Sequence, residues 1–252
     1  MVRKMLLNSF CCFDGISPDA ERMLWRNGFI NWRQLAVVAP PLSSRKCQHL
    51  REQIPEMEAA LEGRLVDYFL QRLPIGYRLR LWPFFAEQTA FLDLESTGLD
   101  LASEVTVVGL HFQGKLTQMI KERDLDRLLD SWGQIKLLIT FNGERFDIPL
   151  LKRRFGLEFV PSHIDLWKEA KVHGYAGGLK QIEQQMGISR LSKGIDGRTA
   201  CELWVNRNRD GCLQRLLEYN RDDVLNLRRM ARIILQRSLE GLTLQVPALT
   251  DL

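Results

Sequence analysis

Residues 89–98 read TAFLDLESTG, an apolar run that carries two acidic residues. Residues 89–94 are predicted to form a strand, and Phe91, Leu92 and Leu94 indicate that this strand is buried. VTVVGLHF at 105–112 and KLTQMI at 115–120 follow it, separated from each other by a Gln-Gly turn. We therefore expect residues 89–94 to open a three-stranded antiparallel meander.

The rest of this part of the chain alternates between predicted helices and strands. A helix over 123–132 leads to a strand at 136–141, and a helix over 148–155 leads to a strand at 163–166. The remaining residues are predicted to be helical to about Arg237. Crossover helices between strands give an α/β fold, here a mixed five-stranded sheet with helices on its faces.

The first 80 residues are expected to form a small helical region. Ser17 caps a helix that ends at Gly28, and apolar residues at three- and four-residue spacing predict one long helix over 43–73, bent at Pro55. Proline and glycine interrupt the pattern between about 74 and 86, which gives predicted domains at 1–80 and 86–240. Residues 13–35 loosely resemble a helix-hairpin-helix, although a small helical cap is the favoured interpretation.

The charge, the cysteines and the apolar segments of the chain bear on its partners and its location. The 252 residues carry a net charge of +4, and the basic excess lies in residues 1–84, with 12 Lys/Arg against 8 Asp/Glu. Such an excess is compatible with a nucleic-acid partner, but it is weak support. The five cysteines form no C-x-x-C pair, so free thiols are expected. We also expect no secretory leader and no membrane span, and hence a cytoplasmic protein.

Asp93 and Glu95 lie two apart on the first predicted strand. Side chains of a strand alternate between faces, so these two carboxylates point the same way, about 7 Å apart along the chain. Two neighbouring anions in a buried strand cost free energy, and a hard divalent cation between them removes that cost. The alternative is a strand end with two solvated acids.

Two later segments add acidic residues at the ends of predicted elements. Asp147, in FNGERFDIP at 141–149, stands where a buried strand ends and a helix begins, a position that helix capping also explains. Tyr219 and Asp223 lie four apart on a predicted helix and share a face. Asp222 competes with Asp223, because residues three apart are also neighbours, and spacing leaves the choice open.

These segments together resemble the DEDD 3′→5′ exonucleases of the ribonuclease H-like superfamily, in the subgroup that carries a tyrosine. The resemblance rests on DLESTG at 93–98, FNGERFDIPLL at 141–151 and YNRDDVLNL at 219–227. It favours Asp223 over Asp222, and Glu218 stands where the sister subgroup has histidine. Within the superfamily the sequence is most similar to YprB-like proteins, through HIDLWKEAK at 163–171 and GGLKQIEQQMGISR at 177–190.

The resemblance implies a fold, a reaction and a set of roles. The fold is ribonuclease H-like, and the reaction is phosphodiester hydrolysis at single-stranded or frayed nucleic-acid ends with two Mg²⁺ or Mn²⁺ ions. Four carboxylates are implied as metal ligands and catalytic residues, and a tyrosine as the residue that orients water. These residues are Asp93, Glu95, Asp147, Asp223 and Tyr219.

Leu94, Phe141 and Asn142 flank the acids and are predicted to contact the terminal base, with core packing as the alternative. Two other functions remain open on the sequence. One is a catalytically silent ribonuclease H-like module that binds nucleic acid, and the other is an endonuclease or resolvase on the same fold. The sequence does not distinguish DNA from RNA as the target, and it does not indicate a pathway, an oligomeric state or a protein partner.

Overall fold

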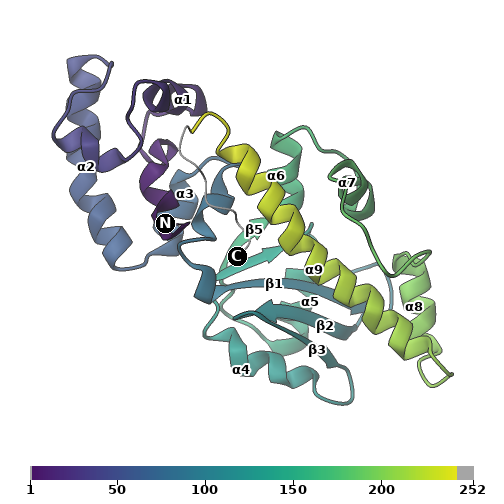
Figure 1. The fold of residues 1–252 in the computed structure, drawn as a ribbon. Coiled ribbons are helices and arrows are strands. Elements are labelled where there is room, and N and C mark those ends of the chain that lie inside the picture. The colour runs from purple at the N-terminus through teal and green to yellow at the C-terminus, as the bar shows by residue number, and fades with distance from the viewer. Residues whose placement is uncertain (1, 243–252) are drawn as a thin grey trace. The chain divides into compact units, whose positions relative to one another are not determined.

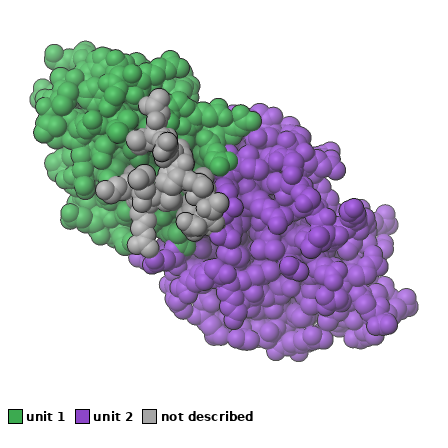
Figure 2. Space-filling view, viewed as in Figure 1, with its two compact units in different colours: residues 1–86, 234–252 green, residues 87–233 purple. Residues whose placement is uncertain are grey.

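A computed structural model describes residues 2–242 of the chain. The chain divides into two compact units, residues 1–86 with 234–252 and residues 87–233, which Figure 2 draws in different colours. The predicted domain ranges 1–80 and 86–240 stay predictions. None of the helices within residues 2–242 combines the length and the apolarity that crossing a lipid bilayer requires.

The first unit is built from helices. Ser17 Oγ accepts a hydrogen bond from Ala20 N at 3.2 Å, so the predicted N-cap of the first α-helix is confirmed. The helical elements are η1 (Val2–Asn8), η2 (Phe10–Cys12), α1 (Pro18–Arg26), η3 (Trp32–Ala36), α2 (Ser44–Glu62), α3 (Val66–Arg72) and η4 (Arg78–Leu81).

The prediction of one helix over 43–73, bent at Pro55, is wrong, because the structure has two helices there, α2 and α3. Helix α2 contains Pro55 within its length and ends instead at Gly63. Arg64 then takes a left-handed backbone (φ 50°), and its N–H and that of Leu65 bond to the carbonyls of Leu61 and Ala60. This is a Schellman motif, which ends a helix by backbone geometry while the apolar spacing of the sequence runs on.

The second unit contains the predicted five-stranded mixed sheet, whose strands run in the order β3-β2-β1-β4-β5. β1 pairs antiparallel with β2, which pairs antiparallel with β3, whereas β4 runs parallel to β1 and to β5. Figure 1 shows this sheet with helices before and behind it. The strands are β1 (Thr89–Ser96), β2 (Val105–Phe112), β3 (Lys115–Ile120), β4 (Leu137–Thr140) and β5 (Ser162–Asp165).

Helices cover both faces of the sheet, and alternation along β1 assigns its side chains to them. Leu92 and Leu94 join an apolar cluster with α4 (Leu128–Trp132) and α5 (Asp147–Phe155). Val107 and Ile120 pack on the other face against α8 (Gly197–Val205) and α9 (Cys212–Ser238). The odd-numbered positions Asp93 and Glu95 therefore belong to the face that α9 covers.

The shorter elements connect these layers. The 3-10 turn η5 (Ala86–Gln88) precedes β1, and η6 (Leu125–Arg127) precedes α4. Helices α6 (Leu166–Val172) and α7 (Leu179–Gln185) lie between β5 and α8 in the chain. Figure 1 shows the long helix α9 running across the sheet in front of β1. This placement brings Tyr219, Asn220 and Asp223 of the YNRDD segment to the acidic strand.

Candidate metal and catalytic site

Three predicted carboxylates meet between the sheet and α9. Asp93 and Glu95 come from β1, and Asp223 comes from α9. One carboxylate oxygen from each of the three lies within 4.8 Å of the other two. Glu95 and Asp223 are buried and Asp93 is half-buried. The structure thus brings together acids that are up to 130 positions apart in the sequence.

A glycine on β2 allows α9 to approach the sheet this closely. Gly109 pairs with Asp93, and a Cβ at Gly109 would lie 2.3 Å from Asn220 Oδ1 and 2.6 Å from Val224 Cγ2. Asn220 uses that space: its Nδ2 donates to the backbone carbonyl of Asp93 at 3.3 Å and to Asp93 Oδ2 at 3.2 Å. Its Oδ1 accepts from Gln118 Nε2 at 3.0 Å. Asn220 therefore fixes α9 to β1 beside the carboxylates, a role that sequence reasoning missed.

Asp147 reaches the site from the first turn of α5 and is buried. The structure places it inside the helix, with Phe146 at the N-cap position, so helix capping does not explain this acid. The preceding loop is held by Asp165, whose Oδ1 accepts from the backbone N–H groups of Asn142 at 2.7 Å and Trp167 at 3.0 Å. Asn142 takes the left-handed backbone (φ 56°) that asparagine tolerates.

A cavity of about 250 Å³ opens beside these groups. All five residues predicted as catalytic line it, and so do the three predicted to contact substrate. Asp147 lines this cavity but lies outside the cluster of three carboxylates. The lining residues are Asp93, Leu94, Glu95, Ser96, Leu99, Phe141, Asn142, Phe146, Asp147, Leu179, Gly197, Cys201, Tyr219 and Asp223.

The residues predicted to contact the base differ in what they expose to the cavity. Leu94 is 6% exposed and belongs to the core cluster on the α5 face, so core packing accounts for most of its side chain. Phe141 and Asn142 are partly exposed. Leu99, which sequence reasoning missed, is 70% exposed and lines the same cavity. Its position directly after the DLESTG motif was the signal that the sequence offered.

Burial and mutual repulsion raise the pKa of the acids. Removal from water raises the pKa of both Asp93 and Glu95 well above ordinary values, and the charge of Asp223 raises them further. Burial raises the pKa of Asp147 to about 7, against hydrogen bonds from the backbone N–H groups of Asp147 and Leu94. Burial also raises the pKa of Asp223 to about 6, although Arg190 opposes that rise.

The donor set fits a hard divalent cation. Three carboxylates converge, and Glu95 Oε1 is buried without a hydrogen-bond partner among the described residues. A buried acceptor left without a donor costs free energy, and so does each unneutralised carboxylate. Mg²⁺ and Mn²⁺ prefer oxygen ligands of this kind and would offset both costs.

We predict that the metal-free protein loses stability as pH rises. A carboxyl whose folded pKa is raised contributes stability below its unfolded pKa, near 4, and that contribution is lost as pH rises through the folded value, about 7 for Asp147. In EDTA, the free energy of unfolding of Asp147→Asn should equal that of wild type near pH 4. Near pH 8 it should exceed the wild-type value by about a few kcal/mol. Urea denaturation at both pH values measures this difference. A difference that does not change with pH would contradict the raised pKa.

Tyr219 is 8% exposed and shares its face of α9 with Asp223, as predicted. Burial raises the pKa of its phenol, and the charges of Asp223, Glu95 and Asp93 raise it further. Two cations lie over its ring, with Lys180 Nζ at 4.8 Å and Arg190 Cζ at 5.3 Å from the centroid. The phenol therefore keeps its proton at neutral pH and is available as a hydrogen-bond donor.

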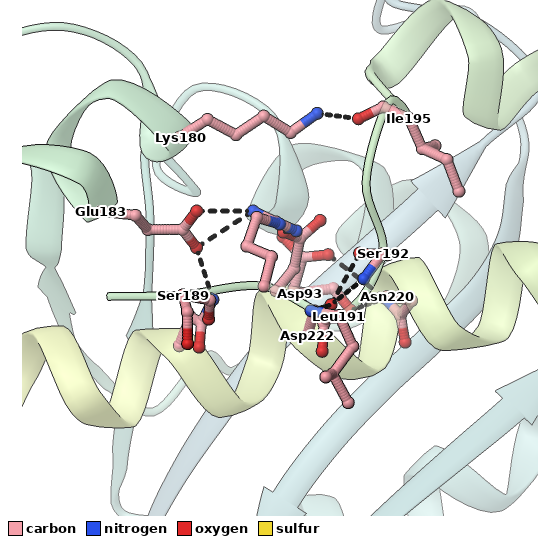
Figure 3. A network of polar contacts seen from close by, with 12 residues as sticks. Asp93, Lys180, Glu183, Ser189, Leu191, Ser192, Ile195, Asn220 and Asp222 are labelled. Atoms are coloured by element: carbon pink, nitrogen blue, oxygen red, sulfur yellow. Dashed lines mark hydrogen bonds and ion pairs between the residues drawn. The ribbon is translucent and has the colours of Figure 1, made fainter. Parts of the chain in front are cut away.

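The structure separates the two neighbouring aspartates that spacing left open. Asp222 Oδ2 accepts from Leu191 N at 2.8 Å and from both N and Oγ of Ser192 at 2.7 Å, contacts drawn in Figure 3. Its carboxylate is thereby committed to the segment between α7 and α8. Asp223 instead joins the carboxylate cluster.

A family model described as the RNase H superfamily matches residues 90–235, more than half of the chain. The chain belongs to the RNase H superfamily. The match spans nearly the whole sheet and nearly all of α9, and every residue that lines the cavity lies within this RNase H domain. The predicted fold class is confirmed. No curated protein sequence matches the chain.

Solved structures that are similar to part of the chain include a DNA polymerase and NrnC. The family B DNA polymerase of the hyperthermophilic archaeon Pyrobaculum calidifontis is 18% identical (TM-score 0.46) over 60% of this chain and 24% of the polymerase. Brucella melitensis NrnC with bound Mg²⁺ is 24% identical and Brucella melitensis NrnC is 26% identical, each with a TM-score of 0.44 over 63% of this chain and 78% of NrnC. This chain thus spans about a quarter of the polymerase's length. The chain is assigned to the RNase H superfamily by the match over residues 90–235.

Proposed function

We propose that the RNase H domain is a divalent-metal-dependent 3′→5′ exonuclease that hydrolyses phosphodiester bonds at single-stranded or frayed nucleic-acid ends. The observation that carries the proposal is the convergence of Asp93, Glu95 and Asp223 within 4.8 Å at a cavity that Tyr219 and Asp147 also line. The direction of digestion and the tyrosine-bearing DEDD subgroup, with its YprB-like relatives, are supported by the sequence motifs.

The reaction sets two demands. A water oxygen must attack a phosphorus that carries negative charge, and the bond from phosphorus to the 3′ oxygen must break while that oxygen gains charge. When bound, Mg²⁺ or Mn²⁺ ions would supply charge neutralisation and a more acidic water. Asp93, Glu95 and Asp223 would hold them, with Asp147 as a further ligand, directly or through water.

Tyr219 suits the task of orienting the attacking water. Its raised pKa makes the phenol a poor base, and the same shift keeps its O–H as a donor at neutral pH. Because Lys180 and Arg190 both lie over the ring and the ring is buried, its O–H position is restricted. We therefore assign Tyr219 to fixing the lone-pair direction of the water by a hydrogen bond.

The cavity favours a strand end as substrate. At about 250 Å³ it is too small for a duplex, and its lining combines exposed apolar surface with a polar amide. Leu99 and Phe141 offer surfaces on which a terminal base would pack, and Asn142 offers an amide beside them. A base separated from its partner enters such a site more readily than a paired one. The cytoplasmic location remains a prediction from the sequence.

A cleavage assay on end-labelled oligonucleotides tests the proposal. With Mn²⁺ and a 5′-labelled single strand, we expect a ladder that shortens by one nucleotide at a time from the 3′ end, and no product in EDTA. Parallel DNA and RNA strands of the same sequence identify the preferred sugar. Internal fragments would instead indicate an endonuclease, and binding without cleavage would indicate a silent module. Asp93→Ala protein from the same purification controls for contaminating nucleases.

A further inference from the structure

A largely buried arginine, 11% exposed, contacts the carboxylate cluster from the segment between α7 and α8. Arg190 Nη1 lies 3.0 and 2.8 Å from the two carboxylate oxygens of Glu183, and its Nη2 donates to Asp223 Oδ1. The three side chains are 11%, 1% and 4% exposed respectively. Arg190 thus joins a predicted metal ligand to an acid on α7 that no step of the proposed reaction uses.

The backbone around Arg190 is fastened to α9. On one side of it, Asp222 holds Leu191 and Ser192 by three hydrogen bonds. On the other side, the Ser189 carbonyl accepts from Asn226 Nδ2 and from Arg229 Nη1, both at 3.4 Å. The guanidinium therefore has little freedom to move away from Asp223.

Glu183 is itself anchored. Asn226 Nδ2 donates to Glu183 Oε1 at 3.0 Å, so this buried carboxylate is held by α9 as well as by Arg190. Because Glu183 balances the guanidinium charge at close range, the pair as a whole exerts a weak field on a nearby cation. What Arg190 adds to the site is then a directional, charge-assisted hydrogen bond to one oxygen of Asp223.

The same guanidinium restrains the tyrosine. Arg190 Cζ lies 5.3 Å from the Tyr219 ring centroid, within the range of a cation–π contact. Lys180 Nζ lies 4.8 Å from that centroid and donates to the Ile195 carbonyl, so it too is fixed by the segment between α7 and α8. Asp223 and Tyr219 are thus restrained together, one turn apart on α9.

We propose that Arg190, held by Glu183, is a positioning residue that orients the Asp223 carboxylate for metal binding and the Tyr219 ring for catalysis. The proposal rests on the proposed function of the same site. It assigns a role to GGLKQIEQQMGISR, which supplies Lys180, Glu183 and Arg190 and contributes none of the predicted metal ligands. Asp223 keeps its second oxygen for a cation while the first is fixed by Arg190.

Mn²⁺ binding to the purified full chain, measured by calorimetric titration, tests the proposal without reference to activity. Arg190→Gln is expected to weaken Mn²⁺ binding by about 10- to 100-fold, the usual effect of removing a residue that orients a metal ligand. Arg229→Gln is the matched control, because Arg229 holds the same loop through Ser189 and does not contact Asp223. The control should bind Mn²⁺ as wild type does. Unchanged or tighter binding by Arg190→Gln would overturn the proposal.

A second variant guards against misfolding, since Arg190→Gln leaves Glu183 buried without its cation. In the double variant Glu183→Gln with Arg190→Met, both charges are removed together, a change that buried ion pairs often tolerate. It still lacks the donor to Asp223, so its Mn²⁺ affinity should fall as far as that of Arg190→Gln. If the double variant melts like wild type and binds Mn²⁺ with wild-type affinity, the positioning role is refuted.

Kinetics separate positioning from substrate binding. We expect Arg190→Gln to lower kcat by about 10- to 100-fold while the KM for an oligonucleotide changes less than about threefold, with partial recovery in Arg190→Lys. Tyr219→Phe should cost less in the Arg190→Gln background than in wild type, because the two residues act together. Full additivity of the two losses in kcat would contradict the coupling.

The outcomes distinguish this proposal from the proposed function. If wild type binds Mn²⁺ but cleaves nothing, the proposed function fails while the Mn²⁺ titration still decides the role of Arg190. Absence of Mn²⁺ binding to wild type overturns both.

Discussion

Asp93→Ala is expected to abolish cleavage, by about 10³-fold or more, while the protein stays folded. Asp93 contributes an oxygen to the three-carboxylate cluster and lines the cavity. Its removal takes away a ligand that neighbouring groups cannot replace, and losses of this size follow when a group central to charge stabilisation is deleted. Initial rates on a 5′-labelled single strand across a Mn²⁺ series measure the effect.

The stability of Asp93→Ala should move in the opposite direction from its activity. Burial and the neighbouring acids raise the pKa of Asp93, so its ionised form destabilises the metal-free fold at neutral pH. In EDTA at pH 8 the variant should therefore melt at or above the wild-type temperature. Asp210→Ala, at an exposed acid that does not line the cavity, is the control and should keep full activity. Retention of activity with wild-type metal dependence in Asp93→Ala would refute the assignment.

Gly109→Ala is expected to destabilise the RNase H domain and to impair its site at the same time. The added Cβ would lie 2.3 Å from Asn220 Oδ1 and 2.6 Å from Val224 Cγ2, and both of those residues are fully buried. Overpacking of this kind costs about 1–3 kcal/mol. Relief requires α9 to move away from β1, which breaks the bonds from Asn220 to Asp93 and displaces Tyr219 and Asp223 with it.

Urea denaturation of Gly109→Ala and a Mn²⁺ titration measure the two consequences. Gly133→Ala is the matched control: Gly133 is exposed, and a Cβ there meets no atom within 4 Å. The control should change the free energy of unfolding by less than about 0.5 kcal/mol. A Gly109→Ala protein with wild-type stability would show that the space between β2 and α9 is not limiting.

The sequence was sufficient to predict the strands of the sheet and eight of the fourteen residues that line the cavity. Alternation in TAFLDLES assigned Asp93 and Glu95 to one face, and four-residue spacing assigned Tyr219 and Asp223 to one side of a helix. The same kind of reasoning failed over 43–73, where the apolar spacing continues through the turn at Gly63 and Arg64. Apolar spacing indicates which residues share a face of a helix. A helix can end through its backbone geometry while that spacing continues.

The sequence did not predict the roles of side chains whose partners lie far away in the chain. Nothing local to Asn220 indicates that it bonds Asp93 on β1, and nothing local to Arg190 indicates that it joins Glu183 to Asp223. Nothing local to Gly109 indicates that Asn220 and Val224 leave no room for a side chain there. Such contacts are set by how α9 and the α7–α8 segment pack, which no short sequence window records.

The sequence by itself determined which chemical groups this protein has, on which faces of its strands and helices they lie, and that the pattern is that of an RNase H superfamily domain. The family motif favoured Asp223 over Asp222, but only the tertiary structure decided that Asp223 lies with Asp93 and Glu95 and that Asp222 holds a loop. The physical reason is range: backbone periodicity orders neighbours a few residues apart, whereas a metal site requires atoms within a few ångströms that come from strands and helices far apart in the chain.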